Sequence, residues 1–309
     1  MNQETKKRKK HNHKHHRIND RNLLIATLLN FVITIAEIAG GIMANSLALL
    51  SDALHNLSDT FSTFIAYIAA LIGKRDANQK KTFGYKRVEI LAASLNAIFL
   101  IIICVFLFKE AYKRIQEPED VDTNIVIVVA TIGLVANVLA AILIRTDAHK
   151  SMNVKAAYVH LIGDSLSSFV VILGAIAIKL YQIYWIDPLI TIGVGIYLIR
   201  EAFLILRDAV NILMQSTPNH INIKKLQNNV ESLEQVKNIH HVHIWRLSDN
   251  EIHLEAHVQI KKDLKLSEIN PIQKEIEKIL EQKFRIHHIT LQFELNPNHS
   301  RNLISKRPE

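Results

Sequence analysis

Two uninterrupted apolar runs constrain the fold of this chain more than any other feature. Residues 90–108 and 124–144 contain no charged side chain, and each run is long enough for a helix to cross the hydrocarbon core of a membrane. Four further apolar stretches, interrupted by a few ionisable residues, lie at about residues 22–44, 46–73, 154–178 and 186–206. We therefore expect an α-helical membrane protein with six transmembrane helices, and these runs exclude a disordered chain of low hydrophobicity.

The distribution of Lys and Arg predicts the orientation of these spans. Basic residues are concentrated before residue 22, in the loop 74–87 and in the stretch 145–155, which six spans place on one side of the membrane. The loops on the opposite side carry few of them. Because basic loops stay on the cytoplasmic side, we expect a multi-pass protein of the cell membrane, surrounded by lipid, with both termini in the cytoplasm.

The last third of the chain has the pattern of a small soluble domain. Residues 221–233 and 266–284 have helical spacing, and residues 241–247, 251–260 and 288–295 indicate strands. The order αββαβ predicts an α+β domain with its strands in one sheet and its helices on one face. Along the second strand, alternation predicts a buried face of Ile252, Leu254, Ala256, Val258 and Ile260, and a solvent-facing side of His253, Glu255, His257 and Gln259.

These patterns divide the chain into four parts. They are a basic His-rich tail at 1–21, a six-helix transmembrane domain at 22–210, a cytoplasmic α+β domain at 211–295 and a C-terminal tail at 296–309. The first tail, with His11, His13, His15 and His16, has two interpretations: a disordered basic segment near anionic headgroups, or a loose metal scavenger. Cys104 is the single cysteine, which excludes a disulfide scaffold, and no cleavable secretory signal opens the chain.

A repeated motif carries the chemistry of the membrane segments. The second and fifth spans both contain His-x-x-x-Asp-x-x-Ser, as His55, Asp59 and Ser62 and as His160, Asp164 and Ser167. Residues four apart lie about 6 Å apart along the axis on one face of a helix, so each span offers an imidazole and a carboxylate in the same direction. Two such helices supply four ligands.

An ionisable side chain at bilayer depth costs about 2.5–3.5 kcal/mol on insertion scales, so the two aspartates need a compensating partner. Two imidazoles and two carboxylates suit tetrahedral Zn²⁺, and Co²⁺ and Cd²⁺ fit the same ligand types. Metal binding there releases protons, because the ligands coordinate in their deprotonated form. The alternative is a neutral polar cluster that joins the two helices. Asp52, three residues before His55, is a candidate access residue or a helix-end residue near water.

With these residues in place, the chain resembles the cation diffusion facilitator family, in particular its zinc-type branch of cobalt-zinc-cadmium resistance transporters. The resemblance covers about residues 22–294 and is most specific in SLALLSDALHNLSD, KTFGYKRVEILAA and HHVHIW. It implies a six-span homodimer that exports divalent metal from the cytoplasm in exchange for protons. The transport site would be formed by His55, Asp59, His160 and Asp164. No prosthetic group is implied, since Zn²⁺ is substrate and regulatory ligand.

The resemblance also implies a regulatory metal site in the cytoplasmic domain. Its ligands would be His240, His257, His287 and Glu294, with Gln292 where some relatives have another ligand; the competing interpretation is a set of surface histidines. Some family members hold a further metal through histidines in the segment before the third span. Here those positions are Lys81 and Tyr85, so we expect no metal there.

Three other functions compete with transport. A membrane metalloenzyme is disfavoured, because the chain lacks His-Glu-x-x-His on a helix and four protein ligands leave no open position for a reactive water. A channel is disfavoured because a closed four-ligand cage releases ions slowly. A membrane sensor or scaffold that binds zinc without moving it stays open. We expect a protein that is not an enzyme and has no nucleic-acid partner.

Overall fold

The computed structural model describes residues 20–73, 75–148, 152–249, 251–296 and 300–304. The four histidines of the N-terminal tail lie outside these residues.

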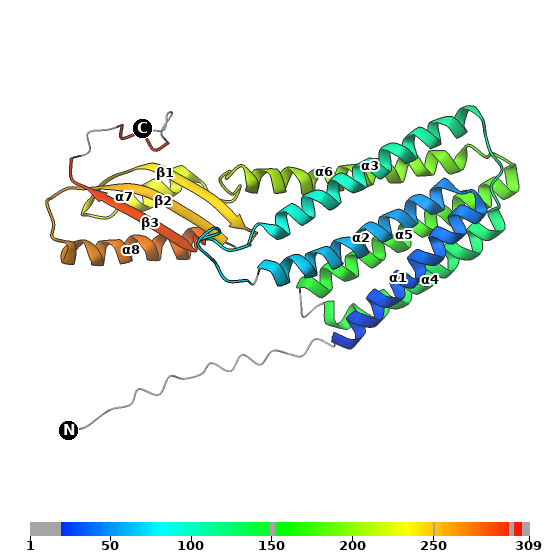
Figure 1. The fold of residues 1–309 in the computed structure, drawn as a ribbon, viewed down its shortest axis with the longest axis horizontal. Coiled ribbons are helices and arrows are strands. Elements are labelled where there is room, and N and C mark those ends of the chain that lie inside the picture. Colours follow the sequence, from blue (N-terminus) through cyan, green and yellow to red (C-terminus); the bar gives the residue numbers. More distant parts are fainter. Residues whose placement is uncertain (1–19, 74, 149–151, 250, 297–299, 305–309) are drawn as a thin grey trace, which may run out of the picture. The chain divides into compact units, whose positions relative to one another are not determined.

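Six long helices follow one another along the first two thirds of the chain (Figure 1). Within the described residues, four segments have the length and hydropathy of a membrane span: 88–116, 123–145, 157–181 and 186–213. The helices are α1 (Asp20–Ala44), α2 (Leu47–Gly73), α3 (Val88–Gln116), α4 (Thr123–Ala148), α5 (Met152–Tyr181) and α6 (Ile186–Leu213). The helical membrane domain predicted from the apolar runs is confirmed.

Helices α3 and α6 extend furthest beyond their apolar runs. The run in α3 ends at Phe108 and that in α6 at Leu206, but the helices continue to Gln116 and Leu213. The added turns of α3 are rich in Lys, Arg, Glu and Ala, which favour helix whether or not a membrane surrounds them, whereas those of α6 contain only Arg207 and Ala209 of these types. The apolar run therefore marks the membrane-crossing part and not the helix end.

The chain forms two compact units. Residues 1–60 and 103–198 make the first, and residues 61–102 and 199–309 make the second. The division passes through α2, α3 and α6, so these helices contribute to both units.

Small residues let the helices of the first unit approach closely. A Cβ added at Gly40 of α1 would lie 2.8 Å from Val129 Cγ2 of α4, closer than side chains pack. Ala44, Ala48, Ala130 and Ala175 belong to a buried cluster drawn from α1, α2, α4 and α5. Such contacts hold membrane helices together, since lipid provides no hydrophobic drive for association.

The second unit contains a three-stranded sheet with two helices. The elements are α7 (Ile223–Glu231), β1 (Val236–Ser248), β2 (Glu251–Ile260), α8 (Leu266–Phe284) and β3 (His288–Glu294). The strand order is β1-β2-β3, with β1 antiparallel and β3 parallel to β2, so α8 is the crossover between two parallel strands. Leu226 of α7 and Ile276 of α8 are buried with Leu254 of β2 in one core, as the αββαβ pattern predicts.

The two faces of β2 differ from the simple alternation. The five aliphatic residues of the predicted inner face are buried, but His253 and Gln259 of the opposite face are also only 3% and 1% exposed. His253 stacks on Trp245, and the Gln259 side chain donates a hydrogen bond to the carbonyl of Leu295. The prediction of a fully solvated outer face was therefore wrong, because neighbouring segments cover both ends of the strand.

A bulge interrupts β1 at its histidines. The register with β2 shifts between His240 and His243, and His241 has a φ of 51°. The backbone N–H groups of His241 and Val242 donate to the carbonyls of Asn302 and Leu303. The described part of the predicted C-terminal tail thus pairs with β1, and the strand begins at Val236, before the predicted start at 241.

Candidate metal centres

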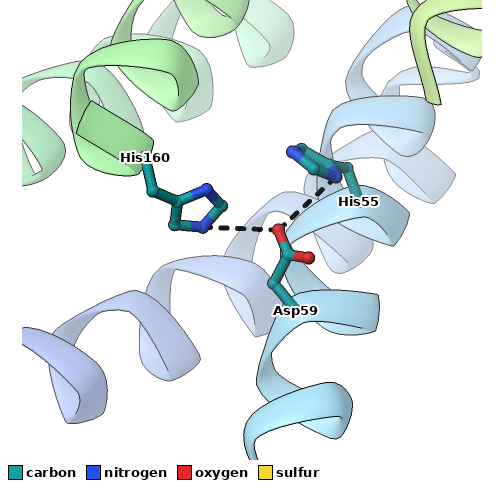
Figure 2. Close-up of side chains that lie close together, drawn as sticks. All are labelled: His55, Asp59 and His160. Atoms are coloured by element: carbon teal, nitrogen blue, oxygen red, sulfur yellow. Dashed lines mark ion pairs between the residues drawn. The ribbon is translucent and has the colours of Figure 1, made fainter. Parts of the chain in front are cut away.

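The repeated His-x-x-x-Asp motif brings two helices to one point. His55 and Asp59 lie on α2, and His160 and Asp164 lie on α5. In Figure 2, His160 reaches across to Asp59, and His55 lies one turn away on the helix that carries Asp59. All four residues belong to the first compact unit.

Three of the four residues, His55, Asp59 and His160, offer ligand atoms that lie within 4.8 Å of one another, and Asp164 lies beside them. His160 Nε2 lies 3.3 Å from Asp59 Oδ2 and 3.5 Å from Asp164 Oδ2. His55 lies 3.5 Å from Asp59 Oδ2 through Nδ1, and 3.8 Å from Asp164 Oδ1 through Nε2. Zinc bonds of about 2.0–2.1 Å at tetrahedral angles separate neighbouring ligand atoms by about 3.3 Å. His55 approaches Asp59 through Nδ1 and Asp164 through Nε2, so its ring must turn before all four side chains can face one ion.

Burial differs among the four side chains. The Asp164 side chain is 2% exposed, and those of His55, Asp59 and His160 are 18%, 33% and 40% exposed. One side of the group is closed by protein and the other is open. A centre of this kind can admit an ion from one direction, and two carboxylates neutralise the charge of a divalent cation.

A buried aspartate from α6 fixes the start of α2. Asp187 accepts hydrogen bonds from Ser46 Oγ at 2.6 Å and from the Leu47 N–H at 2.7 Å, and its two oxygens lie 3.3 and 3.4 Å from the Ala48 nitrogen. A carboxylate at a helix N-terminus satisfies free N–H groups and interacts favourably with the helix dipole. The sequence showed Asp187 only as an interruption of the sixth span, since nothing in a single sequence pairs it with Ser46.

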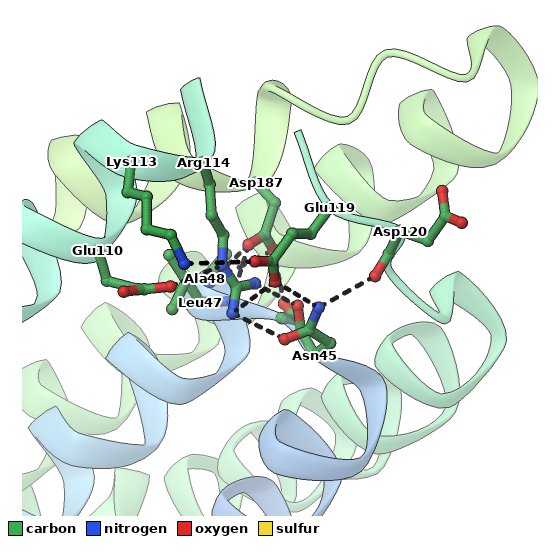
Figure 3. A network of polar contacts seen from close by, with 10 residues as sticks. Asn45, Leu47, Ala48, Glu110, Lys113, Arg114, Glu119, Asp120 and Asp187 are labelled. Atoms are coloured by element: carbon green, nitrogen blue, oxygen red, sulfur yellow. Dashed lines mark hydrogen bonds and ion pairs between the residues drawn. The ribbon is translucent and has the colours of Figure 1, made fainter. Parts of the chain in front are cut away.

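Figure 3 shows a polar network beside this cap. Arg114 of α3 donates to the backbone carbonyl of Asn45 at 2.6 Å and to its side-chain oxygen at 2.7 Å. Asn45 in turn donates to Glu119 at 3.0 Å, and this hydrogen bond, with the nearby Arg114, holds the pKa of Glu119 below its usual value. The connection between α1 and α2 is therefore tied to α3 and to the loop that follows it.

Asp52 has a different partner from the four candidate ligands. Its Oδ2 accepts a hydrogen bond from Ser168 Oγ of α5 at 3.0 Å, and its side chain is 1% exposed. It adds a second link between α2 and α5, one turn from His55. A role for Asp52 in access stays a prediction.

A second group of metal-binding side chains lies on the sheet. His257 Nδ1 is 2.8 Å from Glu294 Oε1, and His240 Nε2 is 3.4 Å from Glu294 Oε2. The three residues come from β2, β3 and β1, and one ligand atom from each lies within 4.8 Å of the others. His240 and His257 are register partners, so the pairing of the strands creates this group.

The structure does not bring His287 to this group. Its Nδ1 accepts a hydrogen bond from the Ile252 N–H at 3.2 Å, near the start of β2, whereas Glu294 pairs with Gln259 near the end of that strand. With a rise of about 3.3 Å per residue, the seven residues from His287 to Glu294 span roughly 20 Å. Gln292, the neighbour of His257 on β3, donates to Glu294 Oε1 at 2.8 Å.

The segment before α3 holds a cation–π contact. Lys81 Nζ lies 4.3 Å from the centre of the Tyr85 ring. This is the pair that replaces the histidines of some family members.

Comparisons with known proteins cover nearly the whole chain. Residues 23–214 match the family model of the cation efflux transmembrane domain, and residues 218–296 match that of the cation efflux protein cytoplasmic domain. The chain is 36% identical to the metal cation efflux system protein CzcD of Cupriavidus metallidurans, over 93% of this chain and 90% of that protein. It is 38% identical to a cadmium, cobalt and zinc/H(+)-K(+) antiporter of Bacillus subtilis, over 97% and 96% of the two chains. It is 32% identical to the zinc transporter ZitB of Escherichia coli, over 91% of this chain and 89% of that protein.

Proposed function

The chain belongs to the cation efflux, or cation diffusion facilitator, family, and we propose that it exports Zn²⁺ from the cytoplasm in exchange for protons. The family is one of transporters and not of enzymes. The names of the three relatives support divalent cation efflux, with zinc, cadmium and cobalt as cargo. Zinc is placed first because two imidazoles and two carboxylates suit a tetrahedral ion of its size.

One observation carries the proposal: four metal-binding side chains from two membrane helices meet, with ligand atoms of His55, Asp59 and His160 within 4.8 Å of one another and Asp164 3.5 Å from His160. His55, Asp59, His160 and Asp164 are the proposed transport ligands. Because the group includes two carboxylates, an ion bound there has no net charge left to desolvate. The same oxygens and nitrogens take up protons when the ion leaves, which gives the exchange its chemistry.

The direction of transport follows from the proposed topology. The basic loops favour a cytoplasmic location for both termini, and the sheet domain would then lie on that side. Cytoplasmic zinc would reach the four ligands from the inside and leave after α2 and α5 rearrange, while protons return. This is alternating access around one site.

The sheet group is proposed as a regulatory zinc site. His240, His257 and Glu294 offer three ligands, which leaves a fourth position for water or another group. The resemblance further suggests a homodimer, in which metal bound to the two sheet domains would favour one transport state. His287 has no place in this set within one chain.

Flux measurements test the proposal. The protein is reconstituted in vesicles loaded with a zinc-sensitive dye, a pH gradient is imposed, and the wild type is compared with Asp164→Ala. We expect gradient-driven zinc movement in the wild type and none in the variant. Ser165→Ala is the matched control, since this neighbouring hydroxyl bonds only the carbonyl of Leu161 in its own helix and its loss should leave flux unchanged.

Two results would contradict the proposal. Tight zinc binding by the wild type with no flux under either sign of gradient would favour a sensor that binds without transport. Full flux in Asp164→Ala would show that the ion crosses elsewhere.

A further inference from the structure

Glu37 of α1 is a buried acid that the proposed transport site does not use. It lies in the middle of an apolar helix, and its side chain is 0% exposed. Its Oε2 accepts a hydrogen bond from Asn56 Nδ2 of α2 at 2.9 Å. Asn56 directly follows His55, so this bond joins α1 to the helix turn that carries two of the proposed ligands.

The packing around Glu37 leaves room for a carboxyl group. The other carboxyl oxygen, Oε1, faces Gly133 of α4, where a Cβ would overlap it. One turn further along the same face of α4 lies Asn137, which is 1% exposed. Glu37 Oε1 and both polar atoms of the Asn137 amide have no hydrogen-bond partner among the described residues. Buried polar atoms of this kind are the usual setting for ordered water.

The charges around Glu37 disfavour its ionised form. Residues 28–44 of α1 and 124–144 of α4 contain no Lys or Arg, and no other ionisable side chain except Glu37 itself. The neighbouring helices bring acids and imidazoles toward this region, Asp52, His55 and Asp59 on α2 and His160 and Asp164 on α5. A single amide donor does not compensate a buried carboxylate in such surroundings. Glu37 is therefore a neutral acid, with a bound proton, when the four ligands hold no metal.

A divalent ion changes this balance. Bound between Asp59 and Asp164, it cancels the charge of these two acids and so removes part of the repulsion that disfavours ionisation of Glu37, while Asp52 is not a ligand and keeps its own charge. The O–H bond of the Glu37 carboxyl can then break, and the proton leaves to water while the carboxylate stays. No other group has to change its covalent state.

We propose that Glu37 is a second ion-binding site of the membrane domain, which binds a proton when the metal site is empty and releases it when a divalent cation binds. The inference rests on the proposed function, since it assumes that His55, Asp59, His160 and Asp164 bind the metal. It adds a proton-carrying group that is not itself a metal ligand, and it assigns Asn56 the task of linking that group to the metal-binding turn of α2.

Proton counting tests the inference without any need for flux. Zinc is added to the purified full-length protein in weak buffer, and the protons released per zinc bound are measured with a pH dye at several pH values. Glu37→Gln keeps an acceptor for Asn56 and cannot ionise, so we expect it to bind zinc and to release fewer protons, by up to about one per zinc. The steepness of log Kd for zinc plotted against pH should fall by the same number of protons per zinc. The sheet group is present in both proteins, so the difference reports Glu37.

Two further variants sharpen the result. Glu37→Asp keeps an ionisable group and should retain the proton release of the wild type. Thr34→Val removes a buried polar group of the same helix, whose hydroxyl bonds the carbonyl of Asn30, and should change nothing.

The inference is overturned if Glu37→Gln releases as many protons as the wild type. It is also overturned if Glu37→Gln loses zinc binding, because the Glu37 carboxylate would then be needed for the metal itself. A wild type that releases protons on binding zinc but shows no zinc flux would defeat the proposed transport function and leave the proton site standing.

Discussion

The two candidate metal groups use the same donor types with different charge. The membrane group has two imidazoles and two carboxylates, whereas the sheet group has two imidazoles and one carboxylate. A bound Zn²⁺ is neutralised in the first group and keeps one positive charge in the second. A low-dielectric membrane requires the first arrangement, and a domain in contact with water tolerates the second. Under the proposed function, charge neutrality distinguishes an ion that must cross the membrane from one that only binds.

Removing one membrane carboxylate should have the largest effect. Asp59→Asn leaves a bound zinc ion with a net positive charge beside α5, so we expect the zinc transport rate to fall by at least about 100-fold. Flux into dye-loaded vesicles measures this. Asp122→Asn, which alters an exposed carboxyl at the start of α4, serves as the control and should transport normally. Transport by Asp59→Asn near the wild-type rate would show that the bound ion need not be neutralised in order to cross.

The membrane group also depends on how α2 is held. Asp187→Ala leaves the Ser46 hydroxyl and the first N–H groups of α2 buried without their acceptor, so the free energy of unfolding should fall by about 2–3 kcal/mol. Asp122 caps α4 in the same manner at an exposed position, and its loss should reduce the free energy of unfolding by about 1 kcal/mol. Denaturant unfolding in detergent gives both values. Equal effects would mean that burial of the α2 cap adds nothing.

The sheet group should tolerate the same kind of change better. Glu294→Gln removes the only carboxylate that bridges His240 and His257, and we expect zinc affinity at the sheet to fall by about 10–100-fold. Maximal transport at saturating zinc should persist. Metal titration of the full-length protein against His287→Ala, which should bind like the wild type, checks this. A complete loss of transport in Glu294→Gln would show that the sheet group is as necessary for transport as the membrane group.

The smallest expected effect is on how the stability of the sheet depends on pH. Burial among Trp245, Phe83 and His288 lowers the pKa of His253 below its usual value of 6.5. The unfolded chain therefore binds the proton more readily, and the contribution of His253 to stability is complete above about pH 6.5 and is lost as pH falls through the lowered pKa. Hydrogen exchange of the β1 and β2 amides, corrected for intrinsic rates, should show weaker protection at the lower pH. His253→Gln should flatten this dependence.

The two groups also differ in how much of them could be predicted from the sequence. The membrane group could be predicted because the motif His-x-x-x-Asp occurs twice, as His55 and Asp59 and as His160 and Asp164. Helical geometry places residues four positions apart on one face, independent of the rest of the chain. The sheet group depends on strand pairing. Its members come from three strands, and a bulge at His241 decides which histidine of β1 faces His257.

Other features lie beyond what one sequence can indicate. His287 has the residue type of a metal ligand, but the parallel register of β3 places it beside Ile252. Asp187 and Ser46 are 141 residues apart, and only the packing of α6 on the start of α2 reveals their bond. Glu37 is an ionisable residue inside an apolar run, but only the structure reveals its contacts with Gly133 and Asn56.

The contact between the C-terminal residues and β1 determines where a tag or truncation can be placed and protects a sheet edge from aggregation. β1 is an edge strand, and exposed edges of this kind recruit strands from other molecules. Asn302 and Leu303 occupy part of this edge through their carbonyl groups. An affinity tag therefore belongs after residue 304, and a truncation before residue 300 would expose an aggregation-prone edge.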